Sequence, residues 1–192
     1  MNQNKSKEYA FDGTVEPYVQ KVLEYINNGN AIDLGSGSGR DSLYLAQNGF
    51  SVTAVDNDEI HLQKLDQKNQ NQGLSIKIVK CDIRDLKIND MFDIVVSNMV
   101  LHFFNENEIK ALIGTMRRLT KSGGINVVVA YSDKNPAGKR PYLFKKNELK
   151  DLYAGWDILS YEEKPTEWFK LEGETELRRN HAVYLLARKP LN

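Results

Sequence analysis

Cysteine is nearly absent from this 192-residue sequence, in which Cys81 is the single example. One cysteine excludes an internal disulfide framework and a site that holds a metal through several cysteines, and we expect no bound metal. Neither sign of charge is in excess, because 26 basic side chains accompany 26 acidic ones. A nucleic-acid-binding protein normally has a basic excess, so we expect no nucleic-acid partner.

Long apolar runs are also missing. No stretch approaches the ~18 consecutive apolar residues that a membrane-spanning helix needs. The first eight residues are polar and lack the apolar segment of a signal peptide. We therefore expect a cytoplasmic protein with no membrane partner.

The remaining composition is that of an ordinary folded chain. Hydrophobic residues make up 41% and charged residues 27% of the sequence, which argues against general disorder. The length suits one domain of the usual size, about 100–200 residues. We expect a flexible tail over residues 1–13 and one domain over residues 14–192.

Short apolar runs alternate with amphipathic segments along most of the chain. The runs predict strands over residues 30–34, 51–55, 75–79, 92–97, 125–131, 156–161 and 181–187. The amphipathic segments predict helices over residues 15–26, 41–48 and 147–153. A further helix is predicted to follow a cap at Asp58, and another to run from Asn105 to a break at Ser122-Gly123-Gly124. Repeated strand–helix units imply a parallel sheet covered by helices on both faces. The last two strands are close enough to pair antiparallel, and residues 162–179 are expected to be irregular.

The most informative segment is Ile32–Asp41, where a strand leads into a glycine-rich turn and the turn opens a helix. Gly35, Gly37 and Gly39 stand at alternate positions, which lets the backbone approach a ligand beside the free N–H groups of the helix. Three glycines are more than turning alone is expected to require. A dinucleotide fingerprint would need a further glycine where Arg40 stands.

Acidic residues follow the next two strands. Asp56 ends the second strand, where its carboxylate can accept hydrogen bonds from both ribose hydroxyls of a nucleoside. Asp82 follows the third strand, within Cys81-Asp82-Ile83. The alternatives are a helix cap for Asp56 and a solvated surface acid for Asp82.

This order of glycine turn and acids resembles the class I S-adenosylmethionine-dependent methyltransferases over roughly residues 32–131. The resemblance implies a doubly wound, seven-stranded, mainly parallel α/β sheet of the Rossmann-like type, with an antiparallel last strand. It implies that S-adenosylmethionine binds at the carboxyl ends of the first four strands, with Asp82 at the adenine amino group and the Ile83 N–H at a ring nitrogen. The expected cofactor-binding residues are Asp33, Gly35, Ser36, Gly37, Gly39, Arg40, Asp56, Asn57, Asp82, Ile83, Asn98 and Met99.

Longer segments resemble the bacterial tellurite-resistance methyltransferase family. They are Asp33–Leu45, Gly49–Asp56, Phe92–Ser97, Gly123–Ala130, Glu148–Lys150 and Leu186–Lys189. Ser36 stands where that family usually has a cysteine, and residues 168–177 do not reproduce its His-Arg pair and further arginine before the last strand. The resemblance therefore specifies the cofactor and leaves the acceptor open.

The acceptor is expected to be small and soft or anionic, such as tellurite, selenite or a thiol. Ser97–Leu101 lacks both the paired prolines of enzymes that methylate exocyclic base amines and the cysteine of base-C5 enzymes. The loop of residues 132–146 has five basic residues against one acid, which would attract an anion, although a solvated surface is the alternative. Candidate substrate-binding residues are Val100, Arg140, Tyr142, Trp168 and Arg179.

Methyl transfer from a sulfonium is an in-line displacement that mainly requires alignment of the reacting atoms. An anionic nucleophile needs no general base, whereas a hydroxyl or ammonium group does. His102 and His181 are the candidate catalytic residues, and a structural histidine packed among aromatic side chains is the alternative for His102. We expect a monomer or a homodimer.

Two other functions remain open. An NAD-dependent oxidoreductase would need the absent third glycine and a Tyr-x-x-x-Lys catalytic pair, which is not evident. A protein that binds S-adenosylmethionine without catalysis would have the same cofactor motifs and an occluded cleft.

Overall fold

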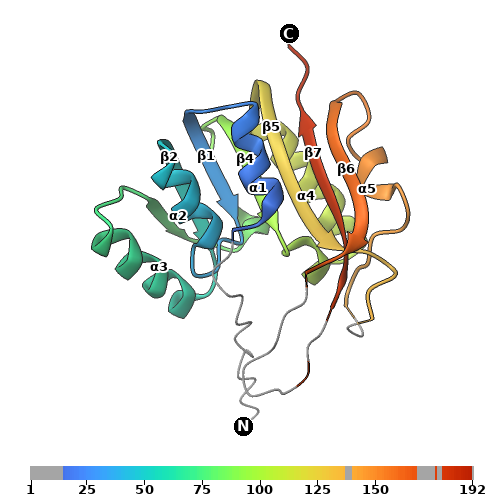
Figure 1. Ribbon diagram of the computed structural model, residues 1–192, viewed down its shortest axis with the longest axis horizontal. Helices are drawn as coiled ribbons and strands as arrows, with labels where there is room; N and C mark the ends of the chain where they lie inside the picture. The colour runs from blue at the N-terminus through green and yellow to red at the C-terminus, as the bar shows by residue number, and fades with distance from the viewer. Residues whose placement is uncertain (1–14, 137–139, 168–175, 177–178, 192) are drawn as a thin grey trace.

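The computed structural model describes residues 15–136, 140–167, 176 and 179–191. Its seven-stranded sheet has the order β3-β2-β1-β4-β5-β7-β6 (Figure 1). The strands are β1 (Gly29–Leu34), β2 (Phe50–Asp56), β3 (Lys77–Lys80), β4 (Phe92–Asn98), β5 (Thr120–Tyr131), β6 (Asp157–Pro165) and β7 (His181–Arg188). The helices are α1 (Pro17–Lys21), α2 (Arg40–Gln47), α3 (Glu59–Asn71), α4 (Glu106–Leu119) and α5 (Glu148–Asp151), with short 3-10 helices η1 (Val22–Glu24), η2 (Ile83–Asp85) and η3 (Leu101–Phe103).

The predicted doubly wound architecture is confirmed. Strands β1 to β5 pair in parallel, and β7 lies antiparallel between β5 and β6. Helices α1, α2 and α3 cover one face of the sheet, and α4 and α5 cover the other (Figure 1). Because both faces are covered, the central strands are almost continuously apolar rather than alternating.

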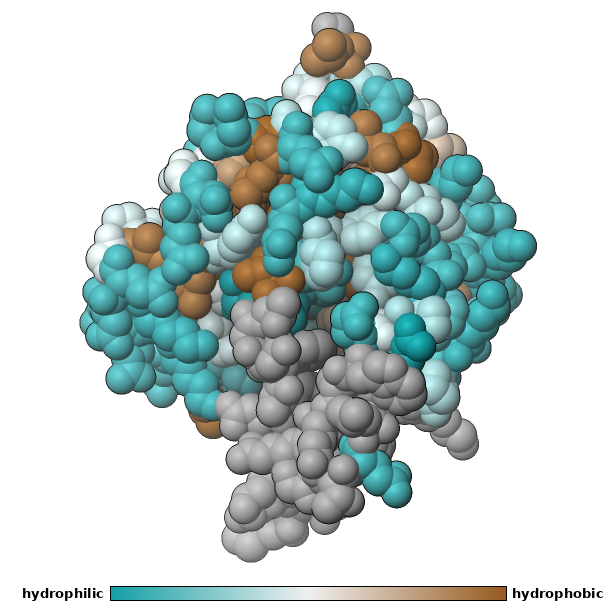
Figure 2. All heavy atoms as spheres, in the orientation of Figure 1, coloured by the Kyte–Doolittle hydropathy of each residue, from teal (hydrophilic) through white to brown (hydrophobic). Residues whose placement is uncertain are grey.

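Two hydrophobic cores result from the alternation of side chains along each strand. Ile32 and Leu34 of β1 pack on the α4 side, where Met116 is fully buried. Ala31, which directly precedes Ile32 in β1, faces the opposite core with Leu45 of α2. On the face seen in Figure 2, polar residues dominate and apolar residues form small separate groups.

The predicted helix cap at Asp58 and the predicted start of a helix at Asn105 are confirmed. The Asp58 carboxylate accepts hydrogen bonds from two N–H groups in the first turn of α3. Asn105 forms a capping box with Glu108, in which each side chain accepts a hydrogen bond from the other residue's backbone N–H. Among the described residues, no helix has the length and apolar character needed to cross a membrane.

Several predicted boundaries are wrong. The segment of residues 15–26 forms only the five-residue α1 and the 3-10 helix η1, because Pro17 begins the helix late and the chain tightens at Val22. The third strand begins at Lys77, two residues later than predicted, and the helix predicted over residues 147–153 is limited to α5. Strand β6 extends to Pro165, into the segment expected to be irregular, because it pairs with β7 along its whole length.

The glycines after α4 do not separate helix and strand as predicted. Strand β5 begins at Thr120, which pairs with Phe92 of β4. The next pair joins Ile125 of β5 to Ile94 of β4, so β5 has more residues between the two pairs than β4 has. The extra residues form a bulge, and a Cβ atom on Gly124 would lie 3.0 Å from the Asp93 carbonyl oxygen. The glycines therefore allow close approach to β4 within an irregular strand.

The Asn105→Ala substitution removes the acceptor for two N–H groups of α4. We expect it to lower the free energy of unfolding by about 1 kcal/mol, whereas Asn105→Gly should cost only about 0.3 kcal/mol. Urea unfolding followed by circular dichroism measures both values. Asn107→Ala, which changes an exposed side chain two residues away, is the control, and an equal loss with this variant would contradict the capping role.

Candidate active site

The carboxyl ends of β1, β2, β3 and β4 meet at one edge of the sheet. Leu34 lies opposite Val55, and Asp56 lies opposite Lys80, so the segments that follow these strands are neighbours. This arrangement brings together the glycine turn, the acids after β2 and β3, and the residues after β4. Ligands of open α/β sheets bind at this edge.

All three glycines of the turn are needed for its backbone conformation. The expectation that turning alone requires fewer than three glycines is wrong. Gly35, Gly37 and Gly39 have φ angles of 78°, 54° and 84°, which side chains rarely tolerate. A Cβ atom would lie 2.4 Å from the Val100 side chain at Gly35 and 2.1 Å from the Leu65 side chain at Gly39, but at Gly37 it would meet no atom of the described residues within 4 Å. The described part of the chain therefore leaves open space beside Gly37.

Asp56 is held by the backbone on both carboxylate oxygens. Oδ2 accepts a hydrogen bond from the Gly37 N–H at 2.8 Å, and Oδ1 accepts one from the Asp58 N–H at 2.8 Å. A carboxylate offers about four lone-pair sites, so one acceptor position remains on each oxygen. That geometry suits the two vicinal hydroxyls of a ribose. Asn57, which follows, is exposed.

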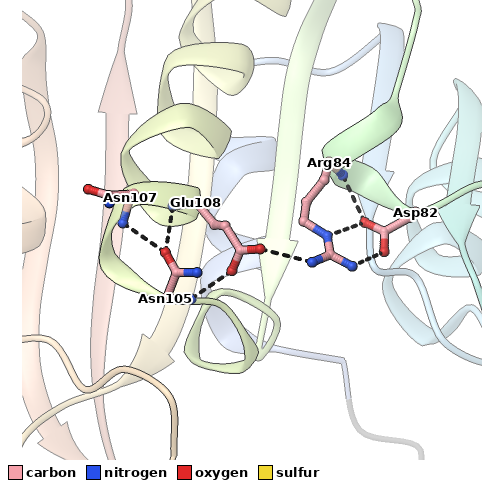
Figure 3. A network of polar contacts seen from close by, with 5 residues as sticks. All are labelled: Asp82, Arg84, Asn105, Asn107 and Glu108. Carbon is pink, nitrogen blue, oxygen red and sulfur yellow. Dashed lines mark hydrogen bonds and ion pairs between the residues drawn. The ribbon is translucent and has the colours of Figure 1, made fainter.

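Asp82 is held by Arg84 instead. Its carboxylate accepts three hydrogen bonds from that residue, one from the backbone N–H and two from the guanidinium (Figure 3). The side-chain hydrogen bonds from Arg84 hold the pKa of Asp82 below its usual value. The Ile83 side chain is buried in the core, which leaves only its backbone available to a ligand.

Asp33 lies beneath the turn and not on the open edge. It is 2% exposed, and its Oδ2 accepts a hydrogen bond from the Ser42 hydroxyl of α2 at 2.6 Å. Burial, followed by the negative charge of Asp41, raises the pKa of Asp33 to about 7. The bond to Ser42 ties β1 to α2, and the predicted contact of Asp33 with the cofactor stays a prediction.

Sequence inspection did not identify Asp41, which joins three segments of the site. Its carboxylate accepts hydrogen bonds from Arg40 Nε at 3.0 Å and Nη2 at 3.2 Å, and from Asn98 Nδ2 at 2.6 Å. It also accepts a longer bond, 3.4 Å, from the backbone N–H of Glu16. Nothing in the local sequence distinguishes Asp41 from an ordinary acid in the first turn of a helix, because two of its partners, Glu16 and Asn98, come from distant segments.

Glu16, also missed, is a second acid that burial holds partly protonated. Desolvation, followed by the nearby charge of Asp41, raises the pKa of Glu16 to about 7. Arg40 lies close to this group and forms an ion pair with Asp41. The region around the start of α2 is therefore rich in acids.

The backbone after β4 is strained. Met99 has a φ angle of 58°, an unusual conformation for a side chain of this size, and its N–H donates to the Val129 carbonyl at 2.7 Å. Val100 packs over the Gly35 turn. Asn98 Oδ1 is buried with no hydrogen-bond partner among the described residues. Strain of this kind is frequent at ligand sites.

His102 lies in an aromatic stack. It is 1% exposed, and its ring stacks on Tyr131 with centroids 4.0 Å apart and tilts against Phe103 at 4.4 Å. The Arg140 guanidinium lies over the Phe103 and Tyr131 rings, 5.2 and 5.6 Å from their centroids. Burial, followed by the charge of Arg140, lowers the pKa of His102 to about 3. His102 is therefore a neutral imidazole near pH 7, and its Nδ1 has no partner among the described residues.

His181 has a different environment at the start of β7. Its Nδ1 lies 2.6 Å from the Ser132 hydroxyl. Burial, followed by the charge of Lys134, lowers its pKa. His181 is therefore also neutral near pH 7.

Tyr142 and Arg179, the remaining described candidates for substrate binding, have separate hydrogen-bond partners. The Tyr142 hydroxyl donates to the Glu148 carboxylate, and Arg179 Nε donates to the Thr166 carbonyl at 2.8 Å. Trp168 lies outside the described residues. Of the predicted acceptor-side residues, His102 and Arg140 are the ones that share a cluster.

The residues at the edge fit an adenosyl ligand with a polar tail. Ser36 Oγ and Asn98 Oδ1 are buried polar atoms without partners among the described residues, and such atoms normally have a hydrogen-bond partner. Ser36 lies on the glycine turn and Asn98 at the end of β4, at the same edge of the sheet. Their chemistry suits the amino-acid portion of S-adenosylmethionine.

Known proteins are similar to this chain in sequence and fold. A family model described as tellurite resistance protein TehB matches residues 3–181. A Haemophilus influenzae relative, described as a probable S-adenosyl-L-methionine-dependent methyltransferase TehB, is 33% identical over 174 residues, which cover 89% of this chain and 61% of the relative. The crystal structure of TehB from Haemophilus influenzae aligns with a TM-score of 0.83 at 31% identity, over 91% of this chain and 62% of that chain.

A more distant structure has the same fold. The Burkholderia thailandensis 1,6-didemethyltoxoflavin-N1-methyltransferase, solved with bound S-adenosylhomocysteine, aligns with a TM-score of 0.70 at 20% identity, over 91% of this chain and 77% of that chain. The chain thus has the fold of the class I S-adenosylmethionine-dependent methyltransferases. Within that class the chain belongs to the TehB family, as the sequence motifs predicted. It spans 61% of the length of the curated TehB relative.

The raised pKa of Asp33 makes the stability of the protein depend on pH. The native state retains this proton up to about pH 7, whereas the unfolded chain loses it near the ordinary pKa of 3.8. The stability from this group therefore falls as the pH rises between these two values. Asp33→Asn keeps an acceptor for Ser42 and removes the titration.

We therefore expect the unfolding free energy of Asp33→Asn to fall less than that of the wild type between about pH 5 and about pH 7.5. Urea unfolding at a series of pH values measures the two slopes. Glu16, whose pKa is raised in the same direction, is present in both proteins and cancels in the comparison. Identical slopes would contradict the buried, protonated state of Asp33.

Proposed function

We propose that this chain catalyses in-line methyl transfer from S-adenosylmethionine to a small, soft or anionic acceptor, of which tellurite, selenite and thiols are examples. The observation that carries the proposal is the geometry of Asp56, with one acceptor position left on each oxygen beside the open space at Gly37. The cofactor supplies an electrophilic methyl group on its sulfonium. The chain has to bind, orient and shield the reacting groups.

The cofactor would span the edge of the sheet from β3 to the glycine turn. Asp82 would accept the adenine amino group, and Asp56 the ribose hydroxyls. The amino-acid portion would meet the Gly35–Gly39 turn, and Asn98 would offer its buried Oδ1 to an N–H donor. Met99 and Val100 would then border the methyl group.

The state of His102 supports an acceptor that arrives already deprotonated. A general base works best with a pKa near the working pH, and burial holds the pKa of His102 near 3. Such an imidazole offers an aromatic stacking surface and one nitrogen that can accept a hydrogen bond. It is too weak a base to remove a proton from the acceptor. Arg140, stacked on the same aromatic cluster, supplies positive charge that favours an anion.

A hydroxyl or amine acceptor is the second possibility, and His181 is the group that would serve it. Its Nδ1 lies within hydrogen-bond distance of the Ser132 hydroxyl, which would orient the ring so that Nε2 accepts the proton of the acceptor. An NAD-dependent oxidoreductase is less well supported, because the third position of its glycine fingerprint holds Arg40, which is paired with Asp41. A protein that binds the cofactor without catalysis stays open and is separated by the assay below.

The ribose contact of Asp56 is testable by calorimetry. Asp56→Ala removes the acceptor for two hydroxyl groups, and hydrogen bonds to a charged partner contribute about 1.5–3 kcal/mol each. We expect at least a roughly tenfold loss of affinity for S-adenosylhomocysteine and no binding of NAD by either protein. Asp66→Ala, which removes an acid from α3, should bind like the wild type. Unchanged affinity in Asp56→Ala would exclude the ribose contact.

The acceptor is testable with a panel of selenite, tellurite, small thiols and a neutral hydroxyl compound. We expect methyl transfer to at least one of the first three. Arg140→Gln should raise the KM for an anionic acceptor roughly fivefold, about 1 kcal/mol, at low ionic strength and by less at high ionic strength. The KM for the cofactor should not change.

Lys150→Gln on α5 is the control for this variant, because it removes a basic residue of α5 from the surface. It should leave both KM values as in the wild type. Wild-type behaviour of Arg140→Gln at low salt would remove the main support for an anionic acceptor. Cofactor binding without transfer to any compound of the panel would favour the non-catalytic alternative.

A further inference from the structure

Arg84 connects the predicted adenine acid to helix α4 (Figure 3). Its Nη2 and Nε donate to the two oxygens of Asp82 at 2.6 and 3.0 Å, and its Nη1 donates to Glu108 Oε1 at 2.8 Å. The residue thus joins the segment after β3 to the first turn of α4. The proposed function does not account for this connection.

The bonds to Asp82 are unevenly distributed between its oxygens. Oδ1 accepts from both the Arg84 backbone N–H, at 2.9 Å, and Nε. Oδ2 accepts only from Nη2. Because each carboxylate oxygen has two lone pairs, Oδ1 is saturated, and one acceptor position remains on Oδ2.

The other end of Arg84 is fixed as well. Glu108 uses its second oxygen, Oε2, to accept the Asn105 backbone N–H at 2.9 Å within the capping box of α4. The Arg84 guanidinium also lies 5.5 Å from the centroid of the Phe104 ring. A long side chain that is half exposed would otherwise sample many rotamers, and these contacts hold it in one.

We propose that Arg84 is a positioning residue for the adenine subsite, which holds Asp82 so that a single oxygen lone pair faces the base. The proposal rests on the adenine contact of Asp82 in the proposed function. One acceptor position matches one N–H of the adenine amino group. Hypoxanthine has a carbonyl oxygen at the same place, and two acceptors that face each other repel.

Without the Arg84 guanidinium, only the backbone N–H of residue 84 would hold Asp82 Oδ1, so the carboxylate would be less firmly oriented and Oδ2 would lose its protein partner. The affinity for an adenosyl ligand should then fall because the carboxylate is less firmly oriented. The discrimination against an inosyl ligand should fall too, because a less restrained carboxylate can turn away from the carbonyl. A role limited to folding would lower the two affinities by the same factor.

The test compares the binding of S-adenosylhomocysteine and S-inosylhomocysteine by isothermal titration calorimetry. Arg84→Gln should weaken binding of the adenosyl ligand about tenfold and reduce the ratio of the two affinities by about threefold or more. Arg84→Lys keeps the charge without the planar fork, so it should recover only part of the loss. The ratio is insensitive to a partly unfolded sample, because unfolded protein binds neither ligand.

Lys110→Gln is the matched control, since it breaks the exposed Glu106–Lys110 ion pair in the same turn of α4. It should leave both affinities unchanged. Glu108→Gln weakens the tether of Arg84 and should give an effect between those of Lys110→Gln and Arg84→Gln.

Asp82→Asn separates failure of this proposal from failure of the adenine contact itself. If Asp82→Asn binds both ligands like the wild type, Asp82 does not contact the base, and the assignment in the proposed function is wrong. If Asp82→Asn loses discrimination but Arg84→Gln keeps the wild-type ratio, Asp82 reads the base and Arg84 does not position it. Loss of discrimination in both variants, without a further loss when they are combined, is the result that we expect.

Discussion

The hydrogen bond from the Gly37 N–H to Asp56 joins the glycine turn to the end of β2, and the arrangement of the cofactor edge depends on it. The Val55 carbonyl accepts two more N–H groups from the turn, those of Gly35 and Ser36. Together these bonds keep the turn next to β2 and orient the Asp56 carboxylate before any ligand is present. A preoriented acceptor costs less entropy on binding than a mobile one, so the contacts that close the turn also prepare the site.

Charge divides the site into two parts. On the nucleoside side, Asp82 is kept anionic by the guanidinium of Arg84. On the other side of the edge, burial lowers the pKa of His102 to about 3, so its imidazole is neutral and lies in an aromatic stack beside Arg140. Acids therefore surround the positions proposed for the cofactor, which carries a sulfonium and an ammonium group, while neutral and basic groups border the position proposed for the acceptor. This separation favours an incoming anion on the acceptor side.

Local sequence signals identified the strands, the cap at Asp58, the helix that opens at Asn105 and the glycine turn, because hydrophobic period and capping chemistry are properties of neighbouring residues. They failed where partners are distant. The bulge that includes Gly124 needs the backbone of β4 beside it. Asp41 is connected to the site by Asn98, which is 57 residues away, and by the Glu16 N–H, which is 25 residues away. The bond of Arg84 to Glu108 depends on the docking of α4 against η2, which no spacing in the sequence reveals.

A crystal structure of the complex with S-adenosylhomocysteine tests the central claim most directly, because it shows where the nucleoside binds. The account predicts one ribose hydroxyl on each oxygen of Asp56, with the bonds to Gly37 and Asp58 retained. It also predicts the adenine amino group on Oδ2 of Asp82. A ligand whose ribose lies away from β2, with Asp56 bonded only to its own backbone partners, would contradict it.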